Sequence, residues 1–324
     1  MPNLEKTVAA KDKRFLLRVE TSHEPEDYRM YEGLRQEIWD YPDDHLAGTR
    51  NMMCENVFHE GGSLFVGAFA EGAGGGFEVD GGHLAGFCYG FVGVRDKNVG
   101  FRDPANLRFY AQYAAVRAAY QSYGLGIRLK EFQREMVLGL LGVSTVICTY
   151  DPLTGVNAHR NIHHFGMDVL EYRVATYGEY GGLLNRLDVP TDRFLMSWDL
   201  RRPARRPDYD LAAALAAPKP VTVGTREVRG KRSRLALEVV ERTDADVPGD
   251  LLLVRVPRDF YRLLQETDVA EEGVRRIPVE WRLATREVFQ TLFERGFRVI
   301  DFLKAKDPGS GSYYVLARSA RLSR

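Results

Sequence analysis

The chain has 324 residues, of which 44% are hydrophobic, and its formal net charge is zero. This length favours two domains, and the apolar content is sufficient for real cores. The balanced charge argues against a protein that binds nucleic acid or an anionic membrane surface. No apolar run approaches the roughly 20 residues of a membrane span, and the polar start of the chain has no signal-peptide core.

The three cysteines, Cys54, Cys88 and Cys148, lie far apart and form no CxxC pair. This pattern is typical of a reducing compartment and argues against a disulfide framework or a structural zinc site. We therefore expect a cytoplasmic protein without a bound metal, a nucleic-acid partner or a membrane partner.

The N-terminal part predicts a strand, a helix and a hairpin. Residues 1–12 are polar, and we expect them to be disordered. A strand is expected over 15–19, and a helix over 25–39, where proline and acidic residues mark the first turn. A second, less regular helical region is expected over 40–62.

The strands expected over 64–69 and 84–94 read as a hairpin with a glycine-rich connection, residues 71–82. Such a connection superficially suggests phosphate binding. Because strands flank it on both sides, a mobile hairpin connection is the better interpretation.

The most informative stretch follows the apolar strand expected over 107–116. It reads Gln121-Ser-Tyr-Gly124-Leu-Gly126 and leads into an amphipathic helix, residues 126–141. Glycine allows a ligand to approach the backbone closely, and a helix start offers unpaired N–H groups with partial positive charge. This combination predicts binding of a phosphorylated cofactor. An ordinary turn with two glycines is the alternative.

The loop differs from two common phosphate motifs. It has no Gly-Lys-Ser/Thr, so it is not a Walker loop, and Leu129 stands where a Rossmann loop has its third glycine. A β-branched strand over 143–149 follows the helix, Asp151-Pro152 ends that strand, a short helix is expected over 155–165 and a strand over 167–177.

Residues 201–220 are rich in proline, alanine and arginine and read as a linker. The region 221–324 alternates strands and helices, and its longest helix, expected over 279–295, has an apolar stripe that predicts core packing. The stripe consists of Trp281, Ala284, Val288, Phe289 and Leu292.

The pattern Q-x-x-G-x-G, followed by helix, strand, helix and strand, resembles the acetyl-CoA loop and the conserved half of the GNAT acyltransferases. The segments TYDPL, NAH, NIHHFGM and PTDRFLMSWDL are similar to one branch of predicted bacterial members. The resemblance covers roughly residues 14–200 and implies an α+β fold. It implies a mixed twisted sheet flanked by helices over 13–200 and a smaller α+β domain over 221–324. The segment FERGFRVIDF resembles the end of a GNAT domain, so the second domain is a candidate degenerate copy.

The resemblance also implies the cofactor site. The pantetheine arm of acetyl-CoA or another acyl-CoA would lie in a V-shaped gap between residues 109–116 and 144–150. The N–H of Val116 or a neighbour would face the thioester, and the loop amides would bind the pyrophosphate. The candidate cofactor-binding residues are Val116, Gln121, Ser122, Tyr123, Gly124, Leu125, Gly126 and Ile127.

One departure from the family concerns catalysis. In many GNAT enzymes a tyrosine acts as the acid that protonates the leaving thiolate. It lies four residues before the glycine that ends the helix after the last core strand, and here that position is Ile162. Candidate replacements are Tyr150, Asp151 and Asn157, although Asp-Pro is also a common helix-entry turn. His159 and His163 have the spacing of metal ligands, but Arg160 occupies the place of the glutamate in HExxH, so we expect no metal.

Two functions from different classes remain open. The favoured one is an acyl-CoA-dependent N-acyltransferase that transfers its acyl group directly, in a ternary complex, to a small amine or amino-acid-like acceptor. Acyl transfer can proceed largely by positioning the reactants, so the missing tyrosine does not exclude it. The alternative is a non-catalytic acyl-CoA-binding or regulatory module. A homodimer is compatible with either function, because exposed strand edges need cover.

Overall fold

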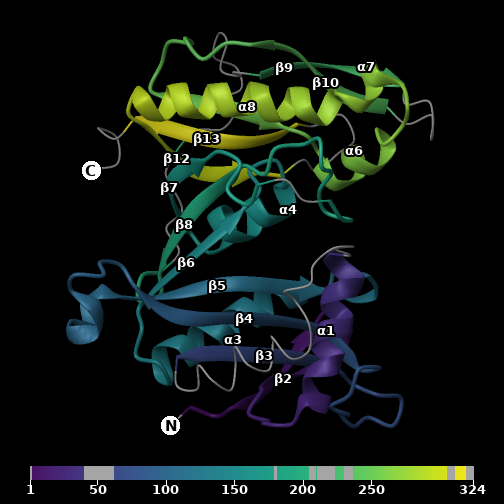
Figure 1. The fold of residues 1–324 in the computed structure, drawn as a ribbon, viewed down its shortest axis with the longest axis vertical. Helices are drawn as coiled ribbons and strands as arrows, with labels where there is room; N and C mark the ends of the chain where they lie inside the picture. The colour runs from purple at the N-terminus through teal and green to yellow at the C-terminus, as the bar shows by residue number, and fades with distance from the viewer. Residues whose placement is uncertain are drawn as a thin grey trace. The chain divides into compact units, whose positions relative to one another are not determined.

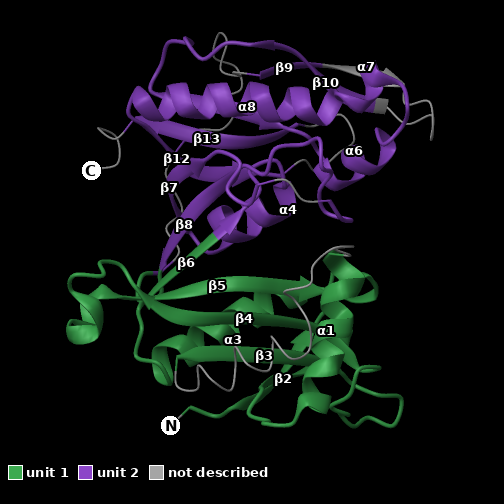
Figure 2. Cartoon of the chain, in the orientation of Figure 1, with its two compact units in different colours: residues 1–148, 199–202 green, residues 149–198, 203–324 purple. Residues whose placement is uncertain are grey.

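The computed structural model forms two compact units, distinguished by colour in Figure 2. The units are residues 1–148 with 199–202, and residues 149–198 with 203–324. The residues that the structure describes are 2–39, 62–178, 181–203, 209, 223–229, 236–304 and 311–318. No helix in these ranges is long and apolar enough to span a membrane.

The first unit contains a sheet with two covering helices (Figure 1). Five strands follow one another in an antiparallel run: β1 (Glu5–Ala10), β2 (Lys13–Val19), β3 (Ser63–Ala70), β4 (Leu84–Val94) and β5 (Leu107–Val116). The sixth strand, β6 (Thr145–Tyr150), joins β5 in parallel and continues into the second unit. The helices are α1 (Pro25–Trp39) and α3 (Leu125–Gly139), and short 3₁₀ turns lie at 100–102, 104–106 and 118–120.

The helices α1 and α3 cover opposite faces of this sheet, because side chains alternate along each strand. On β4, Phe87 and Tyr89 lie in a buried cluster with Tyr28 and Tyr31 of α1. The intervening Cys88 points to α3, where its Sγ lies 4.0 Å from the carbonyl oxygen of Leu129. The alternation of side chains along β4 thus determines which of its residues pack against α1 and which against α3.

The second unit contains the end of β6 and two further strands, β7 (Asp168–Arg173) and β8 (Arg193–Asp199). β8 lies next to β6, and β7 pairs with β8 in antiparallel fashion. A three-stranded sheet has the order β11 (Leu251–Val256), β13 (Ser312–Arg318), β12 (Phe297–Leu303), and β9 (Val223–Arg229) pairs with β10 (Ala236–Thr243). The helices are α4 (Gly155–Ala158), α6 (Phe260–Glu266), α7 (Glu272–Arg275) and α8 (Ile277–Glu294), and a π-helical turn spans His159–His164.

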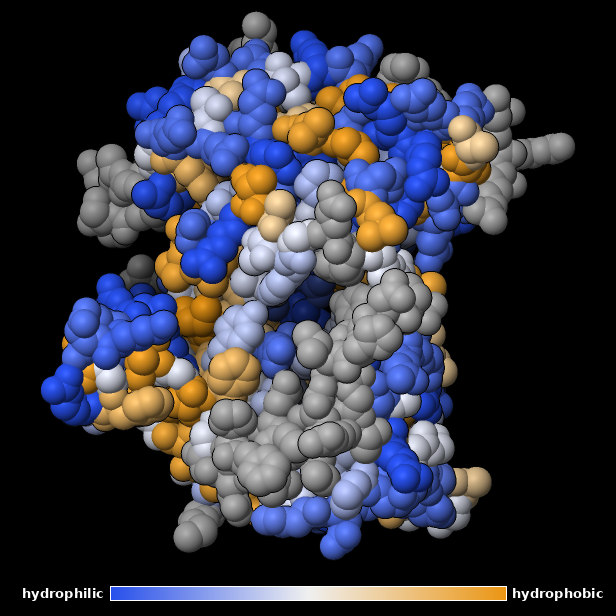
Figure 3. All heavy atoms as spheres, viewed as in Figure 1, coloured by the Kyte–Doolittle hydropathy of each residue, from blue (hydrophilic) through white to orange (hydrophobic). Residues whose placement is uncertain are grey.

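The long helix α8 forms much of the core of the second unit. Trp281, Val288, Phe289 and Leu292 of the predicted stripe are buried, which confirms its role in packing. The ring of Phe289 lies 4.9 Å from that of Phe194 in β8. In the space-filling view of Figure 3, hydrophilic residues predominate on the face of this unit, with hydrophobic residues in small groups. The amphipathic pattern of α8 therefore separates a packed face from a solvated one.

The strands and helices agree closely with the sequence predictions, and the expected α+β architecture with a mixed sheet flanked by helices is confirmed. The expected hairpin of β3 and β4 and the strand β5 are present. The single helix expected over 155–165 instead consists of α4 and the π-helical turn. The expected helical region over 40–62 and nearly all of the linker over 201–220 lie outside the described residues.

The prediction of a disordered N-terminus was wrong. Residues Glu5–Ala10 form β1, which pairs with β2 in register from Glu5 opposite Arg18 to Ala10 opposite Lys13. Only half of this strand is apolar, but the backbone ladder does not depend on the side chains, so the segment can still cover the edge of β2. A tight turn at Lys11, whose φ is 55°, joins the two strands.

The boundary between the units also differs from the expected one near residue 200. It falls inside β6, and residues 149–198 belong with the C-terminal part. The reason is packing: the ring of Tyr172 in β7 lies 5.9 Å from that of Phe289 in α8, and β12 lies against the π-helical turn. The predicted degenerate copy of the GNAT fold remains a prediction.

Candidate functional site

The loop between β5 and α3 has a shape set by two left-handed residues. Ser122 has a φ of 72° and Gly124, which precedes the first helical residue, has a φ of 85°. The side-chain Nε2 of Gln121 donates to the carbonyl oxygen of Val116 at 3.1 Å, so the loop is tied to the end of β5. Leu125 is buried and anchors the other side. The sequence Gln121 to Leu125 thus builds a fixed turn rather than a free connection.

The start of α3 is open to an anionic ligand. No side chain of the described residues caps it, and no described atom lies within 4 Å of where a Cβ on Gly124 would stand. The helical bonds begin with the N–H groups of Ile127 and Arg128, which donate to the carbonyl oxygen of Gly124 at 3.0 and 3.3 Å. The amide groups that precede them are the orphan donors of the helix start, where partial positive charge also gathers. This is the geometry that binds phosphate.

A β-bulge interrupts the strand that leads into this loop. In the pairing of β4 with β5, Tyr89 lies opposite Tyr113 and Gly90 opposite Ala111, so Gln112 is the extra residue. Gly90 is required here, because a Cβ would stand 2.4 Å from the Phe109 ring. Bulges re-aim backbone and side-chain groups and are common next to active sites. This bulge was not predicted, although Gly90 within the apolar run 84–94 is a signal for it.

On its other edge, β5 pairs with β6 at its beginning. The parallel register joins Phe109 with Val146 and Tyr110 with Ile147. The bulge and the predicted loop both come after these pairs along β5. The later part of β5, from the bulge to Val116, therefore extends beyond its pairs with β6. Its main-chain groups on that edge offer the hydrogen bonds that a bound ligand arm requires.

The candidate catalytic tyrosine, Tyr150, is buried in the second unit. Its hydroxyl lies 3.0 Å from that of Tyr314, which in turn donates to the carbonyl oxygen of Pro152 at 2.7 Å. Burial raises the pKa of Tyr314 well above 10.0, so this hydroxyl stays protonated. Sequence reasoning missed Tyr314, because it lies 164 residues from Tyr150 along the chain.

The candidate Asp151 is held in a buried ion pair. Arg282 of α8 donates to both of its carboxylate oxygens, at 2.8 and 2.5 Å, and Arg193 lies 3.5 Å away. The N–H of Leu153 donates to the same carboxylate. Burial by itself would raise the pKa of Asp151, but these neighbours outweigh it, and the pKa lies below 3.8. A carboxylate with this many donors is a weak base, and its contacts favour a structural role.

We expect this ion pair to make the stability of the protein sensitive to acid. The pKa of Asp151 is lower in the folded chain than its ordinary value of 3.8, so its stabilisation is present above that pH and is lost as the pH falls through the folded pKa. Urea unfolding from about pH 6 to about pH 3 should show this loss. The variant Asp151→Asn, which has no such group to protonate, should lose less over the same range; an equal loss would contradict the prediction.

The third candidate, Asn157, binds within its own helical segment. Its Nδ2 donates to the Oγ1 of Thr154 at 3.2 Å, and its Oδ1 accepts from Arg160 at 2.8 Å. Ile162, at the position of the missing tyrosine, is buried in the core. The structure brings Tyr150, Asp151 and Asn157 onto one short stretch at the end of β6, where each has a protein partner.

The histidine pair of the π-helical turn also has an acidic neighbour that sequence reasoning missed. The rings of His159 and His163 are 4.8 Å apart, and His163 Nδ1 lies 2.9 Å from Asp301 Oδ1. Burial, with the nearby cations, lowers the pKa of His159 below 6.5. Elsewhere, Glu78, Asp80 and His83 bring three donor atoms within 4.8 Å on the exposed hairpin connection. There Asp80 accepts hydrogen bonds from the backbone N–H and the ring of His83. These bonds belong to a local turn, which explains why the three side chains lie together.

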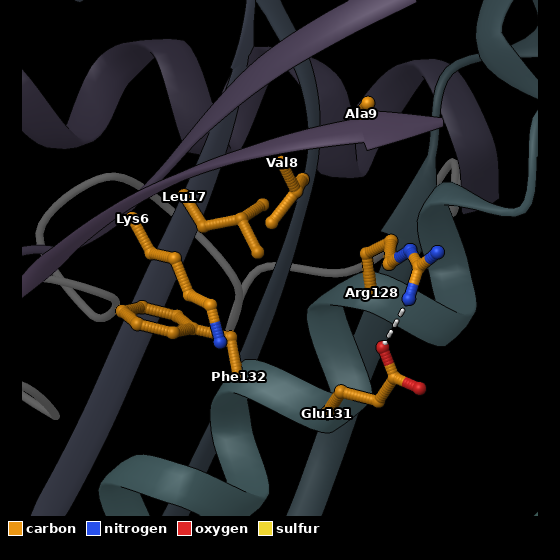
Figure 4. Close-up of a pocket in the computed structure, with 7 residues that line it drawn as sticks. All are labelled: Lys6, Val8, Ala9, Leu17, Arg128, Glu131 and Phe132. Carbon is orange, nitrogen blue, oxygen red and sulfur yellow. Dashed lines mark hydrogen bonds and ion pairs between the residues drawn. The ribbon is translucent and has the colours of Figure 1, made fainter. Parts of the chain in front are cut away.

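A groove lies beside the start of α3, between that helix and the N-terminal hairpin (Figure 4). Its volume is about 330 Å³. Arg128, which directly follows the loop, forms an ion pair with Glu131 on its rim at 2.9 Å. The residues that line it are Lys6, Val8, Ala9, Leu17, Arg128, Glu131 and Phe132. This surface was not predicted, because β1 was expected to be disordered.

No protein-family model matches the chain, and no curated protein matches it. Several solved structures are similar to part of it. An acetyltransferase of the GNAT family from Streptococcus pneumoniae is 16% identical, with a TM-score of 0.40, over 56% of this chain and 97% of that one. NAA60 of Arabidopsis thaliana, bound to a bisubstrate analogue, is 12% identical, with a TM-score of 0.42, over 56% and 97%.

A third similar structure is the ribosomal-protein-S5-alanine acetyltransferase of Vibrio fischeri. It is 11% identical, with a TM-score of 0.43, over 61% of this chain and 98% of that one. Two of these three proteins are named as acetyltransferases. At these identities and scores, the function of this chain has to be argued from its own residues.

Proposed function

We propose that this chain is an acyl-CoA-dependent N-acyltransferase that acts on a small amine or amino-acid-like acceptor. One observation carries the proposal: a bulged strand, β5, leads through the loop 117–124 to an uncapped helix start whose Gly124 leaves open space. Such a helix start binds the pyrophosphate of CoA through main-chain N–H groups, and a bulged strand presents donors for the rest of the ligand.

The loop and β5 divide the ligand between them. The amides from Tyr123 to Gly126 bind the pyrophosphate, since the N–H of Ile127 already donates to Gly124. Leu125 keeps the turn in place from the core. The pantetheine arm runs along β5 from Val116 towards the bulge at Gln112. A main-chain N–H near the bulge then donates to the thioester carbonyl oxygen, where negative charge develops as the amine attacks.

The proton transfers remain part of the proposal. The attacking amine must be neutral, and the leaving thiolate needs a proton. Of the three candidates, Tyr150 is the proposed acid: its proton, which it donates to Tyr314 because Tyr314 donates its own to Pro152, would transfer to the thiolate instead. Asp151 is engaged by Arg282 and acts by holding the end of β6 in place. Asn157 bonds within its own helical segment, to Thr154 and Arg160, and orders that segment.

A non-catalytic acyl-CoA-binding module is the second candidate. It is favoured by the buried Ile162 at the position where many GNAT enzymes have a tyrosine, and by the ion pair that engages Asp151. The two candidates share the loop and differ only in whether a thioester is consumed.

Titration of the wild type with acetyl-CoA, longer acyl-CoAs and free CoA tests the shared part. We expect binding of at least one thioester in the micromolar range or tighter, which corresponds to roughly −8 kcal/mol. Release of free thiol on adding a panel of small amines and amino acids then separates the enzyme from the binding module. Failure of every CoA compound to bind would exclude both functions, and binding without thiol release from any acceptor would favour the module.

A further inference from the structure

The N-terminal hairpin brings two lysines to the loop between β5 and α3. The Nζ of Lys13 lies 5.4 Å from the ring centre of Tyr123 and 5.9 Å from that of Tyr120. The Nζ of Lys11 lies 5.8 Å from the Tyr123 ring. Tyr123 directly precedes Gly124, so both ammonium groups stand beside the helix start that the proposed function assigns to the pyrophosphate.

The contacts hold this arrangement in a defined place. Phe15, which is buried in β2, packs edge-on against Tyr120 at 5.6 Å. The turn between β1 and β2 then places Lys11 and Lys13 over the two tyrosine rings, an arrangement that attracts cations to the ring faces. The lysines are therefore positioned by the hairpin, although their head groups remain free to reach a ligand.

These two charges are not neutralised by the protein. Neither Lys11 nor Lys13 has a carboxylate partner among the described residues, and the adjacent Asp12 is exposed and forms no ion pair with any of them. Neighbouring cations behave differently: Arg14 pairs with Glu71 at 2.5 Å, and Arg128 pairs with Glu131 at 2.9 Å. Two free ammonium groups next to an anion-binding loop indicate a second negative group on the ligand.

We propose that Lys11 and Lys13 bind the 3′-phosphate of the CoA nucleotide and make the protein prefer CoA over its 3′-dephosphorylated form. This rests on the proposed function. CoA carries negative charge at two separate places, the pyrophosphate and the ribose 3′-phosphate. The loop amides match the first, and the hairpin lysines supply the charge for the second, a phosphate monoester with close to two negative charges at neutral pH.

The test is calorimetric titration with CoA and with 3′-dephospho-CoA, on the wild type and on the double variant Lys11→Gln/Lys13→Gln. We expect the wild type to bind CoA about tenfold more tightly than dephospho-CoA, as two exposed charge pairs provide. In the double variant CoA should bind about tenfold more weakly, whereas dephospho-CoA should change less than twofold. The preference should also weaken as salt is added.

Lys97→Gln is the matched control, because Lys97 is an exposed lysine before the start of β5, at the opposite end of that strand from the loop. It should leave both affinities unchanged. An equal loss for both ligands in the double variant would place the lysines on the pyrophosphate and overturn the proposal, as would no loss at all. These results leave the proposed function standing, whereas a wild type that binds neither ligand refutes both.

Discussion

Gly124→Val is expected to weaken binding of acetyl-CoA and of CoA by about a hundredfold or more, into the range where calorimetry detects no binding. Two effects add. Gly124 has a φ of 85°, which a β-branched residue adopts only with strain. A valine side chain would also fill the open space above the helix start, where the pyrophosphate is proposed to lie. Titration of the purified variant, with its fold checked by circular dichroism, measures the effect.

Gly142→Val provides the control for backbone strain. Gly142 follows α3 at its other end, has a φ of 65° and also has open space around its Cβ position. This variant should lose stability to a similar extent and keep its affinity for CoA. If both variants bind CoA as the wild type does, the helix start is an ordinary turn. If both lose binding equally, the effect is one of folding and not of the site.

Arg282→Ala is expected to destabilise the protein by about 3–5 kcal/mol, the usual cost of leaving one member of a buried ion pair without its partner. Asp151 is buried, and Arg282 is its principal partner, with bonds to both carboxylate oxygens. Removal of the guanidinium leaves a carboxylate that must stay charged in the core or take up a proton. Urea unfolding near neutral pH measures the change in the free energy of unfolding.

Arg275→Ala is the matched control, because Arg275 pairs with Asp188 and Asp268 at the surface of the same unit. Such exposed pairs contribute roughly 0–1 kcal/mol. Neutralising both members together, as Asp151→Asn/Arg282→Met, should recover part of the loss, since no unpaired charge then remains. A loss in Arg282→Ala no greater than that of the surface control would show that the buried pair contributes little to stability.

The elements around the loop could be predicted from sequence because their signals are local. The apolar run of β5, the glycines at 124 and 126 and the amphipathic pattern of α3 all lie within a few dozen residues. The backbone dihedral of Gly124 agrees with the reason for expecting glycine there. Patterns of this kind depend on neighbouring residues and not on the rest of the fold.

The interactions that decide the roles of the candidate residues could not be predicted, because their partners are distant in sequence. From the sequence alone, Asp151 is expected only in an Asp-Pro turn, because its partner Arg282 lies 131 residues away. His163 has no acidic partner near it in sequence, whereas the fold places Asp301 beside it. The strand β1 was missed for a different reason: half of its residues are polar, and pairing with β2 uses the backbone, which no pattern of side chains reveals.

The boundary inside β6 has a consequence for how this protein can change in evolution. Because residues 149–198 pack with the C-terminal part, residues 1–200 are not an independent module that recombination at residue 200 could transfer. A gene fragment that ended there would expose Phe194 and leave Asp151 without Arg282. The last hundred or so residues are thus needed to complete the packing at the end of β6, and substitutions in α8 are expected to affect that strand through Asp151.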